Sequence, residues 1–291
     1  MEKNSGIGFS RAGRVRRTIN KFVISVWRPL YIAILFFTCI YLIVPTLVIF
    51  LASVSDTSYV TFPPQGVTLK WYGNFFTRQG FVGSLIISLI LATITAGLSV
   101  SASVFISIFF GRKASVLQSW TLSITYLPLL LPSIVYGPAL MIWTSKLQLT
   151  QSYLGTALSL GAGHLILALP FALQSIIVGY ERLDPALEEA GLVMGARPPS
   201  VFRWITLPLL MPTIVSGAVF SFLVSFDEPV VALFFTRADF ITLPVRIFQY
   251  LRYKPDPTVA AIATVMTLIS MTVVVVGHRF VGLDKLMGLR R

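Results

Sequence analysis

Residues 181–208 read ERLDPALEEAGLVMGARPPSVFRWITLP, a polar stretch that separates two long apolar segments. Asp184 followed by Pro185 is a typical helix start, because an acidic side chain accepts a free backbone amide and proline has no amide to satisfy. Gly195 suits the left-handed conformation that ends many helices, and the proline pair just beyond it favours a fresh helix start. We therefore predict a helical hairpin: a short helix, a tight turn and a second short helix.

Each helix of the predicted hairpin has an apolar side. The apolar positions are Leu187, Ala190, Gly191 and Met194 in the first helix, and Val201, Trp204 and Ile205 in the second. Their spacing leaves Glu188 and Glu189 off the first stripe. A surface hairpin of this kind either lies on the membrane or fits a groove on a partner protein, and the helical pattern leaves both possibilities open.

The rest of the chain is strongly apolar. Of its 291 residues 55% are hydrophobic and 12% are charged, and the mean hydropathy is +0.82, which places the chain in a lipid bilayer. About 20 apolar residues in a helix cross a hydrocarbon core roughly 30 Å thick. We predict an all-α membrane protein with six transmembrane helices near residues 30–52, 82–109, 120–144, 154–179, 208–226 and 258–278.

The distribution of Lys and Arg predicts the orientation of these helices. With the N-terminus inside, the cytoplasmic segments hold 16 of these residues and the outer segments hold seven, which favours two cytoplasmic termini in a bacterial inner membrane. The predicted organisation is a basic cytoplasmic segment 1–29, a transmembrane domain 30–281 that contains the loop 181–208, and a cytoplasmic tail 282–291. Because the +12 net charge lies mostly between apolar runs, it argues against nucleic-acid binding.

One ten-residue pattern occurs twice. Pro128 to Gly137 reads PLLLPSIVYG and Pro208 to Gly217 reads PLLMPTIVSG, with seven identical positions. In each copy a pair of prolines should start or bend a helix, since proline lacks an amide and clashes with the preceding turn. The repeat indicates either two related helices beside a pathway or a chance match in a biased composition.

Several chemistries are disfavoured by what the sequence lacks. Cys39 is the only cysteine, and the two histidines, His164 and His278, are far apart, so neither a disulfide nor a metal cluster is predicted. No Gly-rich phosphate-binding loop is present, so energy must come from another chain. No acidic or basic residue falls within the six predicted spans, which disfavours an ion-coupled secondary transporter. No catalytic assembly can be named, and we do not expect an enzyme.

Four residues are candidates for lining a transport pathway: Tyr136, His164, Asp227 and Glu228. His164 lies in the fourth predicted span, where an interhelical hydrogen bond competes with a pathway role. Asp227 and Glu228 follow the fifth span, where they form either an acidic lining for a passing cation or a solvated helix end.

The hairpin resembles the EAA loop of ABC importer permeases. The matching pattern is Glu189–Ala190–Gly191, three residues, Gly195, nine residues, Ile205, one residue, then Leu207–Pro208; the family more often has alanine where Gly191 stands. The resemblance implies a type I ABC importer permease fold whose coupling hairpin docks on an ATP-binding subunit. The coupling residues it implies are Glu188, Glu189, Ala190, Gly191, Gly195, Ala196, Ile205, Leu207 and Pro208.

Two further segments, SFDEPVVALFFT (residues 225–236) and TLPVRIFQYLRY (residues 242–253), are similar to the second permease of the spermidine and putrescine branch. The resemblance implies transport of a small cation such as a polyamine, or alternatively of an opine, an amino acid or another small solute. It also implies three kinds of partner: two ATP-binding subunits that use ATP and Mg, a second, homologous permease, and a periplasmic or extracellular solute-binding protein. No cofactor is expected on this chain itself.

Overall fold

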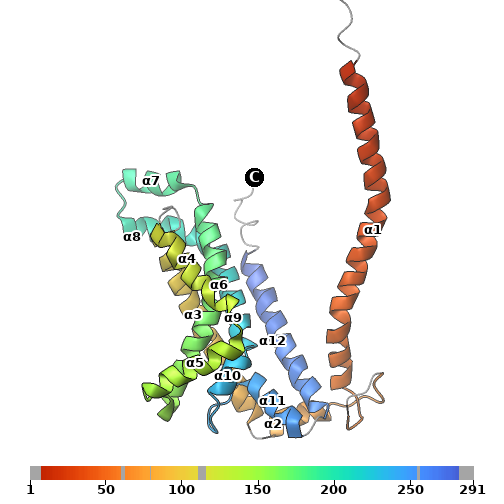
Figure 1. Cartoon of the computed structure of the whole chain (residues 1–291), viewed down its shortest axis with the longest axis vertical. Helices are drawn as coiled ribbons and strands as arrows, with labels where there is room; N and C mark the ends of the chain where they lie inside the picture. Colours follow the sequence, from red (N-terminus) through yellow and green to blue (C-terminus); the bar gives the residue numbers. More distant parts are fainter. Residues whose placement is uncertain (1–7, 60–62, 79, 111–115, 254–255, 282–291) are drawn as a thin grey trace, which may run out of the picture.

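The computed structural model describes residues 8–59, 63–78, 80–110, 116–253 and 256–281. The described chain is a helical bundle with short helices at both of its ends (Figure 1), which confirms the predicted all-α class. Residues 1–7 of the predicted basic segment and the predicted tail 282–291 lie outside the described residues. The helices are α1 Gly8–Ser53, α2 Lys70–Thr77, α3 Phe81–Phe110, α4 Val116–Leu130, α5 Ser133–Lys146, α6 Tyr153–Glu181, α7 Pro185–Val193, α8 Pro198–Val201, α9 Leu207–Phe226, α10 Val230–Phe234, α11 Leu243–Tyr253 and α12 Thr258–Val281, with a 3₁₀ turn η1 at Leu149–Gln151 and a π turn η2 at Phe202–Thr206.

Five helical segments are long and apolar enough to cross a membrane, and a bent pair of helices forms a sixth crossing if it acts as one span. The five are Trp27–Ser53, Phe81–Phe110, Tyr153–Glu181, Pro198–Phe226 and Thr258–Phe280, and the bent pair is Val116–Leu130 with Ser133–Lys146. Five to six spans agree with the predicted number, although two of the predicted spans need correction.

The third predicted span, residues 120–144, is broken. Helix α4 ends at Leu130, α5 begins at Ser133, and the two are bent by 107°. Pro132 takes an extended ψ of 130°, while the Leu131 amide bonds back to the Pro128 carbonyl over 3.3 Å. The backbone therefore leaves the helix just before a residue that cannot donate the next helical hydrogen bond.

The fifth predicted span begins earlier than expected. The continuous helical segment starts at Pro198, not near residue 208, so the second arm of the hairpin is the first part of the α9 span. The junction is the π turn η2, in which the Leu207 amide donates to the Phe202 carbonyl. Pro208 has no amide for the ordinary bond at this point, and a wider turn accommodates that gap.

The centre of the bundle is built by α3, α6 and α9, which pack against one another. Helix α3 buries a row of small residues at helical spacing: Ser84, Ser88, Ala92, Thr95, Ser99, Ser103 and Ser107. Small side chains let helix backbones approach closely within a membrane, where burial of apolar groups gives little drive. Larger side chains such as Leu173 and Ile176 on α6 and Leu210 on α9 are fully buried around this row.

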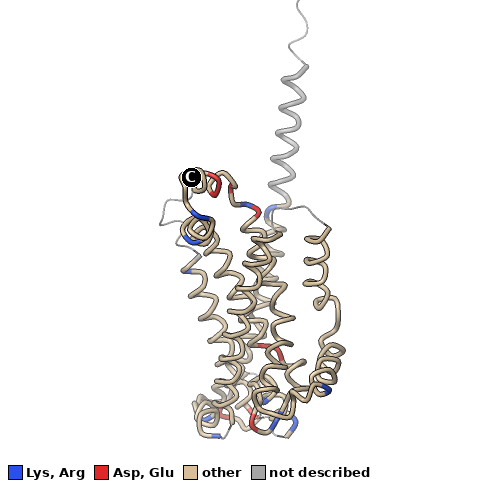
Figure 2. The backbone as a smooth tube through the Cα atoms, turned by 90° about the vertical axis from the view of Figure 1, so that its left-hand side faces the viewer, with Lys and Arg blue, Asp and Glu red and all other residues tan. Residues whose placement is uncertain are grey.

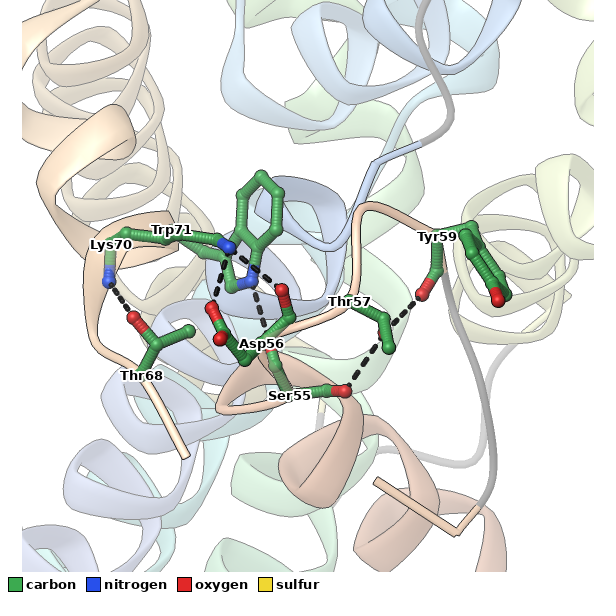
Figure 3. A network of polar contacts seen from close by, with 7 residues as sticks. All are labelled: Ser55, Asp56, Thr57, Tyr59, Thr68, Lys70 and Trp71. Carbon is green, nitrogen blue, oxygen red and sulfur yellow. Dashed lines mark hydrogen bonds and ion pairs between the residues drawn. The ribbon is translucent and has the colours of Figure 1, made fainter. Parts of the chain in front are cut away.

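Helix α1 stands apart from the centre of the bundle and packs mainly along α12 (Figure 1). The chain just after its C-terminal end is held by a polar network (Figure 3): the Lys70 ammonium lies 2.7 Å from the Asp56 carboxylate, and the Trp71 indole donates to the Ser55 carbonyl over 2.7 Å. The network ties the loop after α1 to α2, while the membrane-spanning part of α1 stays largely uncovered by the rest of the chain.

Charged residues among the described residues gather toward the two ends of the bundle, with an acidic stretch also set back from the outer end (Figure 2). This distribution is expected of a membrane protein, because an unpaired charge in the hydrocarbon core costs about 2.5–3.5 kcal/mol or more. The hairpin α7–α8 projects from the end opposite α2 and α11 (Figure 1).

Candidate coupling and substrate-pathway sites

The first arm of the hairpin is capped as the sequence predicts. The Asp184 side chain accepts the Ala186 amide over 3.0 Å, and Pro185 occupies the first turn of α7. At the other end Gly195 has a φ of +88°. The Ala196 amide bonds to the Gly191 carbonyl and the Gly195 amide bonds to the Leu192 carbonyl. This pair of hydrogen bonds is a Schellman motif, which closes α7 and reverses the chain.

The two arms are joined by close packing at Gly191. A Cβ atom at this position would lie 2.8 Å from Ile205 Cδ1 and 3.2 Å from Val201 Cγ2, and Val201 and Gly191 are both buried. The alanine common in the family would therefore push these side chains apart here. The departure from the family pattern at Gly191 has a local structural reason, a closer approach of the two arms.

The outer side of the hairpin is apolar and uncovered. Val193 is 88% exposed, Met194 81% and Trp204 73%. The three apolar positions of the second helix differ in burial: Val201 is buried and Ile205 half-buried, whereas Trp204 is exposed. Among the predicted coupling residues, those that are exposed are Glu189, Ala190, Gly195 and Pro208, whereas Glu188, Ala196, Ile205 and Leu207 are half-buried. An exposed apolar patch on a protruding hairpin is typical of a protein-docking surface.

One contact within the hairpin joins it to the membrane span. The Thr206 hydroxyl donates to the Glu188 carboxylate over 2.6 Å, and Thr206 is 2% exposed. Thr206 was not among the candidates from the sequence. A hydroxyl 18 residues from its partner carries no local signal, and only the folded hairpin brings the two together.

The candidate pathway residues Tyr136 and His164 both make interhelical contacts. Tyr136 donates to the Gly163 carbonyl over 3.2 Å, joining α5 to α6. His164 Nδ1 lies 2.8 Å from Ser225 Oγ, joining α6 to α9, so the expected interhelical hydrogen bond of His164 is confirmed. His164 is 1% exposed, and its Nε2 has no hydrogen-bond partner among the described residues.

The acidic pair after α9 divides into two different environments. The Glu228 carboxylate accepts the amides of Val230 and Val231 over 2.8 and 3.0 Å, so it caps the five-residue helix α10. Asp227 is exposed, and no hydrogen bond or ion pair of its side chain occurs among the described residues. Partial burial against the bundle raises the pKa of the Asp227 carboxyl.

Helix α10 brings the pathway candidates together. A Cβ atom on Gly163 would lie 3.0 Å from the Val231 side chain and 3.5 Å from the Tyr136 hydroxyl. Because Glu228 caps the turn that contains Val231, and Ser225 binds His164, all four candidates lie around the C-terminal end of α9. Asp227, without a side-chain hydrogen bond or ion pair among the described residues, directly follows this helix.

The other acidic residues near the outer end are engaged. Asp239 bonds to Arg237 over 3.1 Å, and this hydrogen bond lowers the pKa of the Asp239 carboxyl. Asp256 accepts the Tyr250 hydroxyl over 2.8 Å and the Thr258 amide over 3.0 Å. Burial, with a smaller effect of Asp256, raises the pKa of Tyr250. No group of His, Cys, Asp and Glu within the described ranges could hold a metal ion.

A bundle with five to six possible membrane crossings and a protruding hairpin with exposed apolar side chains is typical of a polytopic membrane protein. Residues 103–283 match the model of the family described as binding-protein-dependent transport system inner membrane component. The chain belongs to this family of ABC importer permeases.

Comparison with known proteins agrees with this assignment. The chain is 30% identical to the putrescine transport system permease protein PotI of Escherichia coli over 247 residues, 83% of this chain and 86% of that protein. It is 25% identical to the spermidine/putrescine transport system permease protein PotC of Escherichia coli over 248 residues, 85% of this chain and 92% of that protein. Its fold is similar to a chain of a bacterial ABC transporter involved in the import of the acidic polysaccharide alginate, with a TM-score of 0.65, 15% identity and coverage of 92% of this chain and 98% of that one.

Proposed function

We propose that this chain is the permease subunit of an ATP-driven importer for a small organic cation of the polyamine class. One observation carries the proposal: a single helical segment, Pro198–Phe226, begins in the protruding hairpin and ends next to Asp227, whose carboxylate has no hydrogen bond or ion pair within the described part of the chain. A force applied to the hairpin therefore reaches the four pathway candidates through one continuous element.

ATP hydrolysis takes place in separate subunits that dock on the exposed apolar side of the hairpin, so this chain is not itself an enzyme. Those subunits use ATP and Mg, and their closure moves the hairpin and with it α9. A second permease completes the pathway, and a solute-binding protein docks on the outer end near α2 and α11. Transport is then a shift between two arrangements of the helices, driven by differential binding of nucleotide and of the loaded receptor.

The hairpin faces the cytoplasm of a bacterial cell in this proposal. The excess of Lys and Arg on its side of the membrane supports that orientation and two cytoplasmic termini. Helices α2, α11 and α10 lie toward the opposite end of the bundle (Figure 1). With the hairpin in the cytoplasm, that end faces the solute-binding protein.

The proposed docking of the ATP-binding subunits is tested by Val193→Asp. Val193 is 88% exposed, so the substitution should leave the permease folded while placing a charge in an apolar interface. We expect at least tenfold weaker co-purification with the ATPase and loss of substrate-stimulated hydrolysis, since an unpaired charge buried at an interface costs several kcal/mol. The matched control is Val67→Asp, which is 83% exposed near the opposite end and should leave co-purification with the ATPase at the wild-type level. It is compared by co-purification alone, because the solute-binding protein is proposed to dock at that end. Wild-type assembly of Val193→Asp would refute the docking surface.

The nature of the cargo is supported by Asp227 and by the polyamine relatives. In Asp227→Asn we expect roughly fivefold lower uptake of spermidine than in the wild type and a smaller loss for putrescine, because a partly exposed charge pair is worth about 1 kcal/mol. The control is Asp239→Asn, whose carboxylate is already paired with Arg237. Equal uptake of both cations by Asp227→Asn and wild type would make Asp227 a solvated helix end without a role in cation binding. Failure of the wild type itself to take up either cation would instead favour an opine, an amino acid or another small solute.

A further inference from the structure

We infer that Glu188 and Thr206 are positioning residues that join the hairpin to α9, so that movement of the hairpin becomes movement of the membrane span. The inference rests on the proposed function, in which an ATP-binding subunit moves the hairpin. It adds the place within this chain where that movement is passed on.

The contact is short and shielded. The Thr206 hydroxyl lies 2.6 Å from a Glu188 carboxylate oxygen, and Thr206 is almost fully buried. Hydrogen bonds to an ionised acceptor are about twice as strong as neutral ones. Because Glu188 belongs to α7 and Thr206 ends the π turn η2, this bond connects the first arm of the hairpin to the residue directly before α9.

The π turn makes such a brace necessary. In η2 the Leu207 amide bonds to the Phe202 carbonyl, five residues back, and Pro208 supplies no amide to the turn that follows. Turns of this kind, where the regular helical hydrogen bonds are interrupted, are where helices bend. Without a cross-link, a push on α7 would be absorbed by bending at η2. With Glu188 bonded to Thr206, α7 and the first turn of α9 move together.

Within the described part of the chain, the packing of α7 is mainly on the second arm of the hairpin. Helix α7 packs on α8 and on η2, and the Gly191 contact with Ile205 and Val201 is to the same second arm. A cavity of about 210 Å³ lies between the hairpin and the bundle and is lined by Ile108 of α3 and Tyr180 of α6 together with hairpin residues. Among the described residues, the packing of α7 on the second arm therefore leads into the membrane through the start of α9.

The test uses Thr206→Val, which keeps the shape of threonine and removes the hydroxyl. The assembled complex with its ATP-binding subunits and partner permease is placed in lipid nanodiscs, and amide hydrogen exchange is followed with and without ATP plus vanadate. In the wild type we expect protection of the hairpin by the ATPase and a nucleotide-dependent change in α9. In Thr206→Val we expect the hairpin protection to remain and the α9 change to fall at least threefold.

Two variants make the result specific. Thr206→Ser keeps a hydroxyl and should restore the α9 change, which a purely structural loss of packing would not predict. Glu188→Ala removes the acceptor from a half-buried position on α7, so it reports on the contact even if Thr206→Val does not assemble. The double variant should be no worse than either single one, because both remove the same interaction.

The outcomes separate the two proposals. If the wild-type hairpin gains no protection from the ATPase, the proposed function fails and the inference fails with it. A second outcome is that the ATPase protects the hairpin while the α9 change stays at the wild-type level in Glu188→Ala and in any Thr206→Val that assembles. The coupling role of the Glu188–Thr206 contact is then refuted, while the proposed function stands. If Thr206→Val and Glu188→Ala lose both the α9 change and spermidine uptake per ATP hydrolysed, relative to the wild type, the inference is supported.

Discussion

The two copies of the proline-rich pattern have different structures. In residues 128–137 the chain bends by 107° between α4 and α5, whereas in residues 208–217 α9 runs through without interruption. Seven of the ten residues are identical, and both copies contain two prolines four residues apart. The local sequence permits a bend in each copy, so the surroundings decide whether the bend occurs.

The second copy is held straight by its neighbours. Leu210 is fully buried against Tyr180 and Leu183, and the Ser175 hydroxyl on α6 donates to the Thr213 carbonyl over 3.0 Å. In the first copy the equivalent leucine, Leu130, is 79% exposed. The start of α9 is packed on α6, so a bend there would break these contacts. The end of α4 has few contacts around Leu130, so a bend there breaks little packing.

The largest test of this comparison removes the leucine from each copy. Leu210→Ala should lower the free energy of unfolding by about 2–5 kcal/mol, because it opens a cavity in a packed core. Leu130→Ala should change it by less than about 0.5 kcal/mol, because the side chain has little packing to lose. Thermal unfolding of the purified protein in one detergent measures both. Similar losses from the two variants would contradict the packing explanation.

A smaller difference is expected for the glycine that ends each copy. A Cβ atom on Gly217 would lie 3.2 Å from the Ala172 backbone, whereas on Gly137 it would meet the Phe234 ring. Gly217→Ala should cost about 1–3 kcal/mol, since a packed helix backbone cannot yield. Gly137→Ala should cost less, because α10 is short and a ring can turn. The same unfolding measurement ranks them, and the reverse order would show that α10 is held more firmly than α6.

The smallest effect should come from the interhelical hydroxyl. Ser175→Ala removes the bond to Thr213 and should cost about 0.6 kcal/mol, the average for such bonds in membrane bundles. The matched control is Ser101→Ala, whose hydroxyl bonds within its own helix to the Gly97 carbonyl and should matter still less. A larger loss of unfolding free energy in Ser175→Ala than in Leu210→Ala would mean that this bond, more than Leu210 packing, keeps α9 straight.

Local chemistry was predictable from the sequence. Asp184 and Gly195 sit where a cap and a left-handed turn were expected, because capping involves only neighbouring residues. The predicted regions of the membrane spans were also recovered, since lipid imposes a length of apolar helix on any chain. The protrusion of the hairpin agrees with the expectation, while the coupling and pathway roles of its residues and of Asp227 stay predictions.

The sequence by itself determined the all-helical membrane class, the number of apolar segments and the position of the hairpin, because these depend on hydropathy and on contacts a few residues apart. Only the tertiary structure decided that one proline pair bends and the other does not, and that Thr206 meets Glu188. It also decided that Glu228 caps α10 while Asp227 has no partner among the residues described. Each of these features depends on packing or hydrogen bonding in the folded chain. For the helix bend and the Thr206 contact, the interacting residues are far apart in the sequence, so a local sequence pattern cannot predict them.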